Sequence, residues 1–435
     1  MNLRPSLARL FLLICLACAA CSSPAAGPTP APSAILPPTA TTVPTPLPPA
    51  PTPTEQAVRG TLSIRHSWSE AELPALVQII DSFRLKHPEV YFDVLYIPAN
   101  ELRGRFEMDS RAGQGPALLL GPAEWGPALY DQGLVADLNG RLDPALSGEL
   151  NAPALNALRY GEALVGLPYS MEGVVLFRNK EIMTISPPSL KELTALAQTT
   201  TQGDVLGAYL ERSFFFSGAH LDGLGGQLMD AQGQPAFAGP AGLAWIELLR
   251  SFEQAGPPDY LSDEDLSRFQ EGQVGWIIDG TWNLRPLAAG IGPENLAIDP
   301  WPAAGSGRMA GYVVPQAIYV NAAAAEAQQF TALAFIAHLL SPEAQSLLAE
   351  AGRIPVTQQA SLSDPVMGPL VKQALTALAG GAAYPNTPAM AVYAQNLDLA
   401  LRAIFADGAD PAQALQSAAD AIRSALAATQ LTPTP

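Results

Sequence analysis

The stretch Gly166–Ile182, GLPYSMEGVVLFRNKEI, combines a turn, an apolar run and one carboxylate. The Gly-Leu-Pro turn precedes the apolar residues Val174 to Phe177, and Glu172 lies just ahead of that run. Short apolar runs bounded by Gly and Pro are typical of strands. Two interpretations of Glu172 stay open at this point: a solvated acid at a strand edge, or a carboxylate that binds a ligand.

Similar runs recur along the chain and alternate with helical patterns. Strands are predicted at 61–66, 90–97, 116–121, 272–280 and 312–320. The run at 90–97, VYFDVLYI, is nearly continuous in apolar and aromatic residues, which is typical of a strand covered by helices on both faces. The alternation predicts an α/β fold with ligand loops at the strand ends.

Several predicted helices begin with a recognisable N-terminal signal. Ser69–Glu72 and Ser189–Glu192 fit the S-x-x-E capping box. Ser341-Pro342 supplies an N-cap followed by Pro at the first helical position, and Ser262–Asp265 predicts a further helix start. Helices are predicted at 124–135, 242–256 and 322–340, and the C-terminal third is helical throughout. We interpret the whole as two α/β lobes.

The N-terminus has the features of an export signal. Residues 1–20 carry two arginines followed by an apolar stretch that is too short to span a bilayer. Cys21 follows Ala19-Ala20 and precedes two serines, which resembles the lipobox of bacterial lipoproteins. Cys21 is therefore the predicted lipidation site, with Cys18 as the alternative acceptor. A cleaved signal with a chance cysteine is the other interpretation.

Residues 21–58 comprise the predicted lipidated cysteine and a Pro/Thr-rich tether, and 431–435 form a similar tail. All three cysteines lie within the first 21 residues, so the folded body has neither a disulfide nor a thiol site. The formal net charge is −17, which argues against nucleic acid or an anionic membrane surface as a partner.

No enzyme motif is present. The four histidines lack zinc-site spacing, and there is no G-x-S-x-G elbow, P-loop or G-x-G-x-x-G. Glu124 and Glu172 could imitate a glycosidase pair, but nothing in the sequence separates their pKa values. We expect a protein that is not an enzyme and that uses no metal or cofactor.

Six motifs occur in the order found in one known family. They are FRLKHPEV (83–90), LYDQGLVADL (129–138), GLPYSMEGVVLFRNKEI (166–182), SPPSLKEL (186–193), FQEGQVGWIIDGTW (269–282) and YPNTPAMAVY (384–393). Over about 60–425 the chain resembles family 1 extracellular solute-binding proteins, the maltose-binding type that serves ABC importers. Two departures are Pro116-Ala117-Leu118 in place of the family's Pro-Asp-[Ile/Val], and Phe177-Arg178 in place of an apolar-Tyr pair.

The resemblance implies a two-lobed periplasmic-binding-protein fold of type II, with a hinge that the chain crosses three times. By that pattern 59–170 plus 314–362 form one lobe, and 171–313 plus 363–430 form the other. A ligand bound between the lobes favours the closed state, which the membrane subunits of the importer then recognise. The protein would be a monomer, exported and lipid-anchored on the outer face of the cell membrane.

The same resemblance identifies the residues expected to bind ligand. Glu172 matches a hinge-edge acid that accepts hydrogen bonds from sugar hydroxyls. Trp282 matches a stacking Trp, and sugar rings present C–H faces that pack on aromatic rings. The full predicted set is Trp68, Ser69, Glu124, Trp125, Glu172, Phe215, Trp282, Tyr312, Arg353 and Tyr393. Trp245 and Trp276 are expected in the core instead.

A di- or oligosaccharide is therefore the expected ligand. A polyamine or a phosphorylated small solute is the alternative ligand for the same fold. A ligand sensor that reports to a membrane partner is the alternative role, since it would use the same cleft.

Overall fold

The computed structural model describes residues 57–70, 72–257, 264–357 and 359–430. The predicted signal segment, Cys21, the tether up to residue 56, Ser262 and Asp263 lie outside these described residues. The main sheet has the strand order β2-β1-β3-β12-β6-β8-β7, with β13 beside β12 and β9 beside β6.

The strands of the main sheet are β1 (Gly60–His66), β2 (Val90–Tyr96), β3 (Leu118–Pro122), β6 (Leu167–Asn179), β7 (Leu206–Tyr209), β8 (Val274–Gly280), β9 (Leu296–Asp299), β12 (Tyr312–Val320) and β13 (Ala382–Ala383). Two small hairpins pair β4 (Arg159–Tyr160) with β5 (Ala163–Leu164) and β10 (Ala303–Ala304) with β11 (Gly307–Arg308). The helices are α1 (Leu73–Lys86), α2 (Ala99–Arg111), η1 (Ala123–Trp125), α3 (Gly126–Asp131), α4 (Pro144–Gly148), α5 (Ala152–Asn156), α6 (Leu190–Thr200), α7 (Phe214–Ser217), α8 (Ala219–Gly223), α9 (Pro240–Ala255), α10 (Glu264–Gln270), η2 (Thr281–Asn283), α11 (Leu284–Ile291), α12 (Glu326–Leu339), α13 (Pro342–Glu350), α14 (Gly368–Ala379), α15 (Met390–Phe405) and α16 (Pro411–Gln430).

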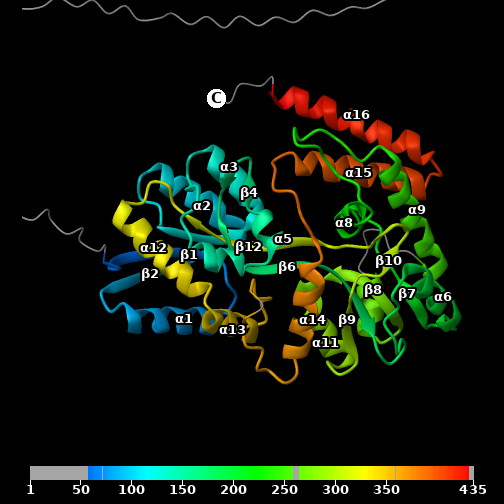
Figure 1. The fold of residues 1–435 in the computed structure, drawn as a ribbon, viewed down its shortest axis with the longest axis horizontal. Helices are drawn as coiled ribbons and strands as arrows, with labels where there is room; N and C mark the ends of the chain where they lie inside the picture. The colour runs from blue at the N-terminus through cyan, green and yellow to red at the C-terminus, as the bar shows by residue number, and fades with distance from the viewer. Residues whose placement is uncertain (1–56, 71, 258–263, 358, 431–435) are drawn as a thin grey trace, which may run out of the picture. The chain divides into compact units, whose positions relative to one another are not determined.

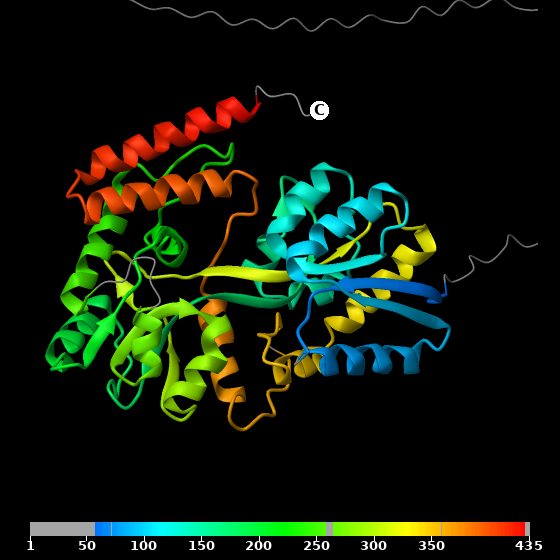
Figure 2. The ribbon, with the colours of Figure 1, turned by 180° about the vertical axis from the view of Figure 1, so that it is seen from behind.

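Two long strands are shared by two groups of elements. β6 pairs with β12 through Leu167–Gly173 and with β8 and β9 through Val174–Asn179. We call β1, β2 and β3 with α1, α2, α12 and α13 the first lobe. β7, β8 and β9 with α6, α9, α10, α11 and α14 are part of the second lobe. Both views show β6 and β12 running from one group of helices into the other (Figures 1 and 2).

A third connection between the lobes is the segment between α13 and α14. Its backbone is held to the first half of β6 by an isolated bridge between Met171 and Ile354, and to the turn before α5 by a bridge between Leu150 and Thr357. With β6 and β12, this segment makes three passages of the chain between the lobes, as the predicted hinge requires.

The side chains of the apolar run Val174–Phe177 on β6 pack into two different hydrophobic cores. Because side chains alternate across a strand, Val174 and Leu176 pack into one hydrophobic core while Val175 and Phe177 pack into the other. Trp245 and Trp276 are buried in the first of these cores, which confirms the expectation for both. The apolar run therefore marks a strand covered on both faces, and Glu172, just ahead of the run, is half-buried between buried neighbours.

Most local predictions are confirmed. β12 has the predicted bounds, and the Ser189 and Ser341 side chains accept hydrogen bonds from backbone N–H groups at the starts of α6 and α13. The helix predicted from residue 322 begins only at Glu326. At the start of α1 the pairing differs from a capping box: Glu72 is the N-cap, and its carboxylate accepts from the backbone N–H and the hydroxyl of Ser69.

The prediction that residues 90–97 form a strand covered on both faces is wrong. β2 lies at the edge of the sheet, and Tyr91 is 68% exposed and Tyr96 53% exposed. A continuous apolar run indicates only that the segment favours a strand. Whether helices cover both faces of that strand depends on its place in the sheet, and this place is set by pairing between segments far apart in the sequence.

Candidate functional site: a cleft between the lobes

Two pairs of parallel strands bring the predicted ligand loops together. In the first lobe β1 leads to Ser69 and β3 leads to Glu124, and these two strands run parallel. In the second lobe β8 leads to Trp282, and the parallel strand β7 is followed by the short helix that carries Phe215. The carboxyl ends of parallel strands lie at one edge of a sheet, which is where α/β proteins place their ligand loops.

A cavity of about 400 Å³ lies between these loops, and we call it the larger cavity. Ser69 and Arg353 line it from the first lobe, and Trp282 and Arg285 line it from the second. Glu172 on β6 lies between the two walls. Four of the ten predicted ligand residues thus meet in one cavity.

A smaller cavity, of about 220 Å³, adjoins the first because Glu172 also lines it. Its other walls include Glu124 after β3, Phe215 on α7 and Gln316 on β12, with Tyr384 on the segment after β13. We call the two cavities together the cleft. Glu172 therefore occupies a central position in the cleft, at the middle of the strand that joins the lobes.

Glu172 is half-buried, and this burial raises the pKa of its carboxyl. The positive charge of Arg353 and a hydrogen bond with Gln316 act in the opposite direction, and the charge of Glu72 adds to the increase. A carboxylate that has lost much of its hydration gains from any hydroxyl that enters the cleft and donates to it.

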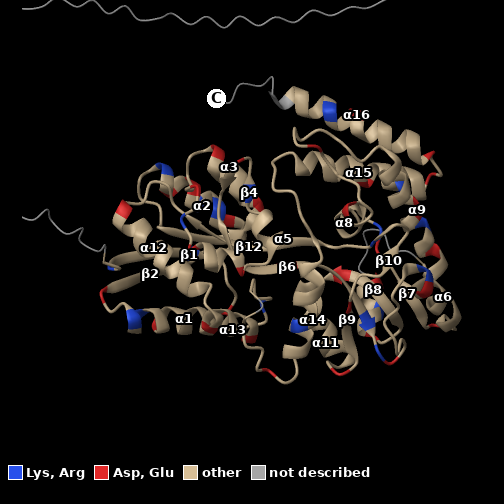
Figure 3. Cartoon of the chain, viewed as in Figure 1, with Lys and Arg blue, Asp and Glu red and all other residues tan. Residues whose placement is uncertain are grey.

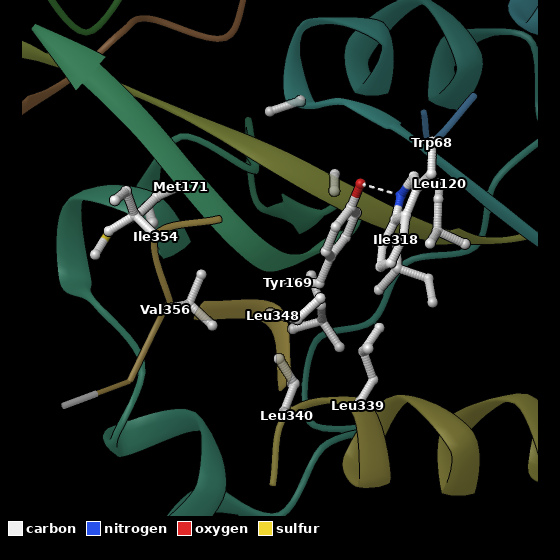
Figure 4. Packing of buried hydrophobic residues seen from close by; sticks show 14 of the residues in the cluster. Trp68, Leu120, Tyr169, Met171, Ile318, Leu339, Leu340, Leu348, Ile354 and Val356 are labelled. Atoms are coloured by element: carbon white, nitrogen blue, oxygen red, sulfur yellow. Dashed lines mark hydrogen bonds between the residues drawn. The ribbon is translucent and has the colours of Figure 1, made fainter. Parts of the chain in front are cut away.

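Arg353 is held in place by several contacts on the wall of the larger cavity. Its guanidinium forms a 2.8 Å ion pair with Glu72 and a 3.2 Å hydrogen bond to the Ser170 hydroxyl. It also lies 4.5 Å from the centroid of the Trp68 ring, within cation–π distance. Trp68 is itself 2% exposed and hydrogen-bonded to Tyr169 (Figure 4). The structure thus places Trp68 behind Arg353 and outside the linings of both cavities, and a direct ligand contact from it stays a prediction.

Aromatic rings form a row along the second-lobe side of the cleft. Trp282 is 40% exposed, and its ring centroid lies 6.1 Å from that of Phe215. Tyr384 continues the row at 5.7 Å from Phe215. Tyr384 is absent from the set predicted from sequence, although it directly precedes the Pro-Asn-x-Pro motif that suggested Tyr393.

Trp125, Tyr312 and Tyr393 line neither cavity. Trp125 is 9% exposed and packs against Gly121, where a side chain would collide with its ring. Tyr393 is fully buried in the second-lobe core, and its hydroxyl donates to the carbonyl of Gly233. Tyr312 is 1% exposed and meets Tyr384 edge-on at 5.1 Å, so it supports a ring that does face the cleft. Ligand roles for these three stay predictions.

Some cleft residues carry no signal in the sequence. Gln316 lies inside a strand and lines the smaller cavity, next to a register shift between Gln316 and Ala317 in the pairing of β12 with β6. Irregularities of this kind redirect side chains next to functional sites. Glu72 also lines the larger cavity. An acidic side chain just before a helix is stabilised by the helix dipole, so its presence there needs no ligand to explain it.

Within the described ranges no group of three or more His, Cys, Asp or Glu side chains is arranged to hold a metal ion.

Among the helices of the described residues, none by itself has the length and apolar character needed to cross a membrane, and one bent pair, α12 with α13, meets those criteria jointly. Acidic and basic residues are interspersed along the helices of both lobes (Figure 3).

Comparisons with known proteins agree with this geometry. A family model described as bacterial extracellular solute-binding protein matches residues 78–419. The galactooligosaccharide-binding protein of Bacillus subtilis (strain 168) is 24% identical over 382 residues, which cover 83% of this chain and 89% of that protein. The maltotriose-binding protein of Pyrococcus abyssi (strain GE5 / Orsay) is 23% identical over 233 residues, which cover 52% of this chain and 50% of that protein.

Solved structures show the same fold. The extracellular solute-binding protein of Staphylococcus aureus, determined in complex with maltose, matches with a TM-score of 0.74 at 21% identity, over 85% of this chain and 98% of that chain. The cyclic alpha-maltosyl-1,6-maltose binding protein of Arthrobacter globiformis matches with a TM-score of 0.73 at 20% identity, over 84% of this chain and 98% of that chain. These likenesses confirm the predicted two-lobed α/β fold.

Proposed function

Because the chain belongs to the family of bacterial extracellular solute-binding proteins, we propose that it captures a di- or oligosaccharide in the cleft and delivers it to an ABC importer. The observation that carries this proposal is the row of Trp282, Phe215 and Tyr384 opposite the half-buried carboxylate of Glu172. Aromatic faces accept the C–H faces of sugar rings, and the carboxylate accepts hydrogen bonds from the hydroxyls at the rim.

Polar groups along the cleft support this choice of ligand. The side-chain nitrogen of Asn386 is buried at the smaller cavity and has no hydrogen-bond partner within the described residues. A buried donor without a partner costs about 1–3 kcal/mol, which a ligand oxygen would recover. Glu124 and Gln316 add acceptor and donor groups at the same cavity. The names of the two curated relatives, one for galactooligosaccharides and one for maltotriose, agree with a sugar of more than one ring.

The hinge supplies the capture step. β6, β12 and the segment between α13 and α14 join the lobes, and the predicted lobe boundaries place the hinge at residues 170, 313 and 362. A ligand held by Glu172 and Arg353 on one side and by Trp282 on the other gains contacts only when the lobes are together. Its differential affinity for that state then closes the cleft.

The N-terminal features complete the proposal. Residues 1–20 act as the export signal, Cys21 becomes lipidated, and the Pro/Thr-rich segment after it links the anchor to the folded lobes. Such an anchor keeps a monomeric binding protein close to the membrane subunits of the importer. The family itself is one of exported proteins that bind solutes.

The test is thermal unfolding of the purified protein with a panel of mono-, di- and oligosaccharides, with spermidine and glycerol phosphate as charged controls. A ligand present at 100 times its Kd adds about 2.7 kcal/mol to the free energy of unfolding. We expect stabilisation by one series of sugars and loss of that stabilisation in Trp282→Ala. Tyr91→Ala, which removes an exposed ring on β2 outside the cleft, should leave the response intact. A response to spermidine or glycerol phosphate with none to any sugar would overturn the sugar assignment.

A further inference from the structure

One hydrogen bond joins the helical layers of the two lobes across the larger cavity. Arg285, on α11 of the second lobe, donates to the carbonyl oxygen of Glu350, the last residue of α13 in the first lobe, at 3.1 Å. α13 packs against α1 and α12, whereas α11 packs against α10 and β9. The two ends of this bond therefore belong to parts of the protein that move apart when a hinge opens.

The way α13 ends explains why this carbonyl is available. Gly352 donates to the carbonyl of Ala349, and Arg353 donates to the carbonyl of Leu348, which is the Schellman arrangement at a helix C-terminus. That arrangement satisfies two of the last carbonyls and leaves the one of Glu350 for another donor. A guanidinium suits this position because the C-terminal end of a helix carries partial negative charge.

Gly352 makes the approach of Arg285 possible. Its φ is +89°, in the left-handed region that the Schellman turn requires and that glycine adopts without strain. A Cβ at this position would also collide with Nε of Arg285. One residue thus ends α13 and leaves room for the guanidinium of the opposite lobe.

The residues around this hydrogen bond line the same cavity as the residues expected to bind ligand. Arg285, Gly352 and Arg353 all line the larger cavity, as do Glu172 and Trp282. The turn that receives Arg285 is therefore the same turn that presents Arg353 to the ligand. Because the bond crosses the cavity itself, separation of the lobes would lengthen and break it.

We propose that Arg285 is a positioning residue that clasps the two lobes through the Glu350 carbonyl and thereby slows release of a bound ligand. The inference rests on the proposed function for its ligand readout, whereas the hydrogen bond forms whenever the lobes are together and can be followed without a ligand. Loss of one exposed hydrogen bond at this place corresponds to about a three- to tenfold change in an equilibrium constant.

The experiment compares the full-length protein with Arg285→Ala and Arg285→Lys. Binding of the sugar that stabilises the wild type is followed by stopped-flow fluorescence. We expect Arg285→Ala to raise Kd about three- to tenfold, mainly through faster dissociation, with the association rate and the ligand-free unfolding temperature nearly unchanged. Arg285→Lys, which keeps the charge and one donor, should recover part of the loss. Arg105→Ala, which removes an exposed arginine from α2, is the matched control and should behave as wild type.

A second readout needs no ligand. Amide hydrogen exchange of the peptides that cover Leu348–Arg353 and Leu284–Ile291 should be faster in Arg285→Ala than in the wild type and in Arg105→Ala. If no sugar binds the wild type, the proposed function fails while this exchange result still decides the clasp. Unchanged exchange in both peptides, or a dissociation rate within twofold of wild type, would overturn the clasp.

Discussion

The indole N–H of Trp68 donates a 2.9 Å hydrogen bond to the hydroxyl of Tyr169, a residue 101 positions further along the chain. Both rings are buried and lie side by side (Figure 4). The guanidinium of Arg353 lies 4.5 Å from the centroid of the first ring and 5.4 Å from that of the second. The loop after β1, the start of β6 and the turn after α13 are thereby fixed to one another. This arrangement determines where the positive charge of Arg353 stands in the larger cavity.

Trp68→Phe should weaken both folding and ligand binding. The substitution leaves the buried Tyr169 hydroxyl without its donor, which costs about 1–3 kcal/mol of unfolding free energy. It also alters the ring beneath Arg353, so ligand affinity should fall. Urea unfolding and titration with the identified sugar measure the two effects.

The matched control is Trp245→Phe. Trp245 is equally buried, donates a 3.0 Å hydrogen bond to the Ser217 carbonyl and lines neither cavity. We expect a similar loss of stability with unchanged affinity. Equal affinity losses in the two variants would contradict a role for Trp68 at the cleft.

Ligand affinity should decrease when the pH is lowered through the pKa of Glu172. Burial raises that pKa, so the carboxylate is protonated at a higher pH than an ordinary Glu and then offers fewer acceptor sites. Glu172→Gln should bind about tenfold to a hundredfold more weakly at neutral pH and lose the pH dependence. Isothermal titration of both proteins between pH 4 and pH 8 tests this.

The pH dependence of stability in the ligand-free protein should be opposite to that of ligand affinity: Glu172 should lower the free energy of unfolding as the pH rises. For a carboxyl with a raised pKa in the folded state, the stabilising contribution is present below the ordinary pKa and is lost as the pH rises through the raised pKa. Glu172→Gln should therefore stabilise the ligand-free protein at neutral pH relative to acidic pH.

For the affinity prediction, a wild-type ligand affinity that does not change with pH would contradict the ligand role of this carboxylate.

His220 should make the second lobe sensitive to acid. Its side chain is fully buried, and burial lowers the pKa from 6.5 to about 4, although a hydrogen bond with the Ala310 carbonyl opposes the shift. The unfolded chain then binds a proton that the folded chain does not, so stability is complete above pH 6.5 and is lost as the pH falls towards 4. The loss is roughly 3 kcal/mol by pH 4.

Urea unfolding at pH 7.0 and pH 4.5 measures this loss. His220→Gln should reduce the difference between the two pH values, even if it lowers stability at both. His87→Gln, at the partly exposed end of α1, should retain the wild-type difference. An undiminished difference in His220→Gln would assign the acid sensitivity to other groups.

Asp299→Asn should destabilise the second lobe without touching the cleft. The carboxylate of Asp299 is 3% exposed and forms a 2.9 Å ion pair with Arg178, and it also accepts a hydrogen bond from Trp276. Neutralising one member leaves the other charge buried, which costs about 3–5 kcal/mol. Asp420→Asn, which breaks an exposed pair with Arg423, should cost about 1 kcal/mol or less. Chemical denaturation of both variants tests the contrast, and equal losses would contradict it.

The Arg178–Asp299 pair also clarifies a departure seen in the sequence. Phe177-Arg178 stands where the family motif has an apolar-Tyr pair. The structure places the guanidinium of Arg178 between Asp299 and the Met183 carbonyl, away from the linings of both cavities. The charge is therefore explained by a partner 121 residues away, which no local pattern indicates.

Short-range patterns in the sequence determined the elements themselves. The bounds of β12, the serine caps of α6 and α13, and the end of α9 at Gly256 follow from strand propensity and from hydrogen bonds between residues three or four positions apart. The ordered motifs also gave the family and the two-lobed fold. The same patterns located four residues of the larger cavity. Three of them follow a predictable strand or helix end and the fourth lies within β6; they are Ser69, Trp282, Arg353 and Glu172.

Tertiary structure decided which other side chains reach the cleft. Tyr384 faces the smaller cavity while Tyr393 is buried, although both belong to one motif, and β2 became an edge strand although its sequence is that of a covered one. Glu172 acquires its raised pKa from burial, and it lies among Arg353, Gln316 and Glu72, which come from three distant parts of the chain. Such neighbours are set by sheet order and by the packing of the two lobes, and these long-range contacts leave no periodicity in the sequence from which to infer them.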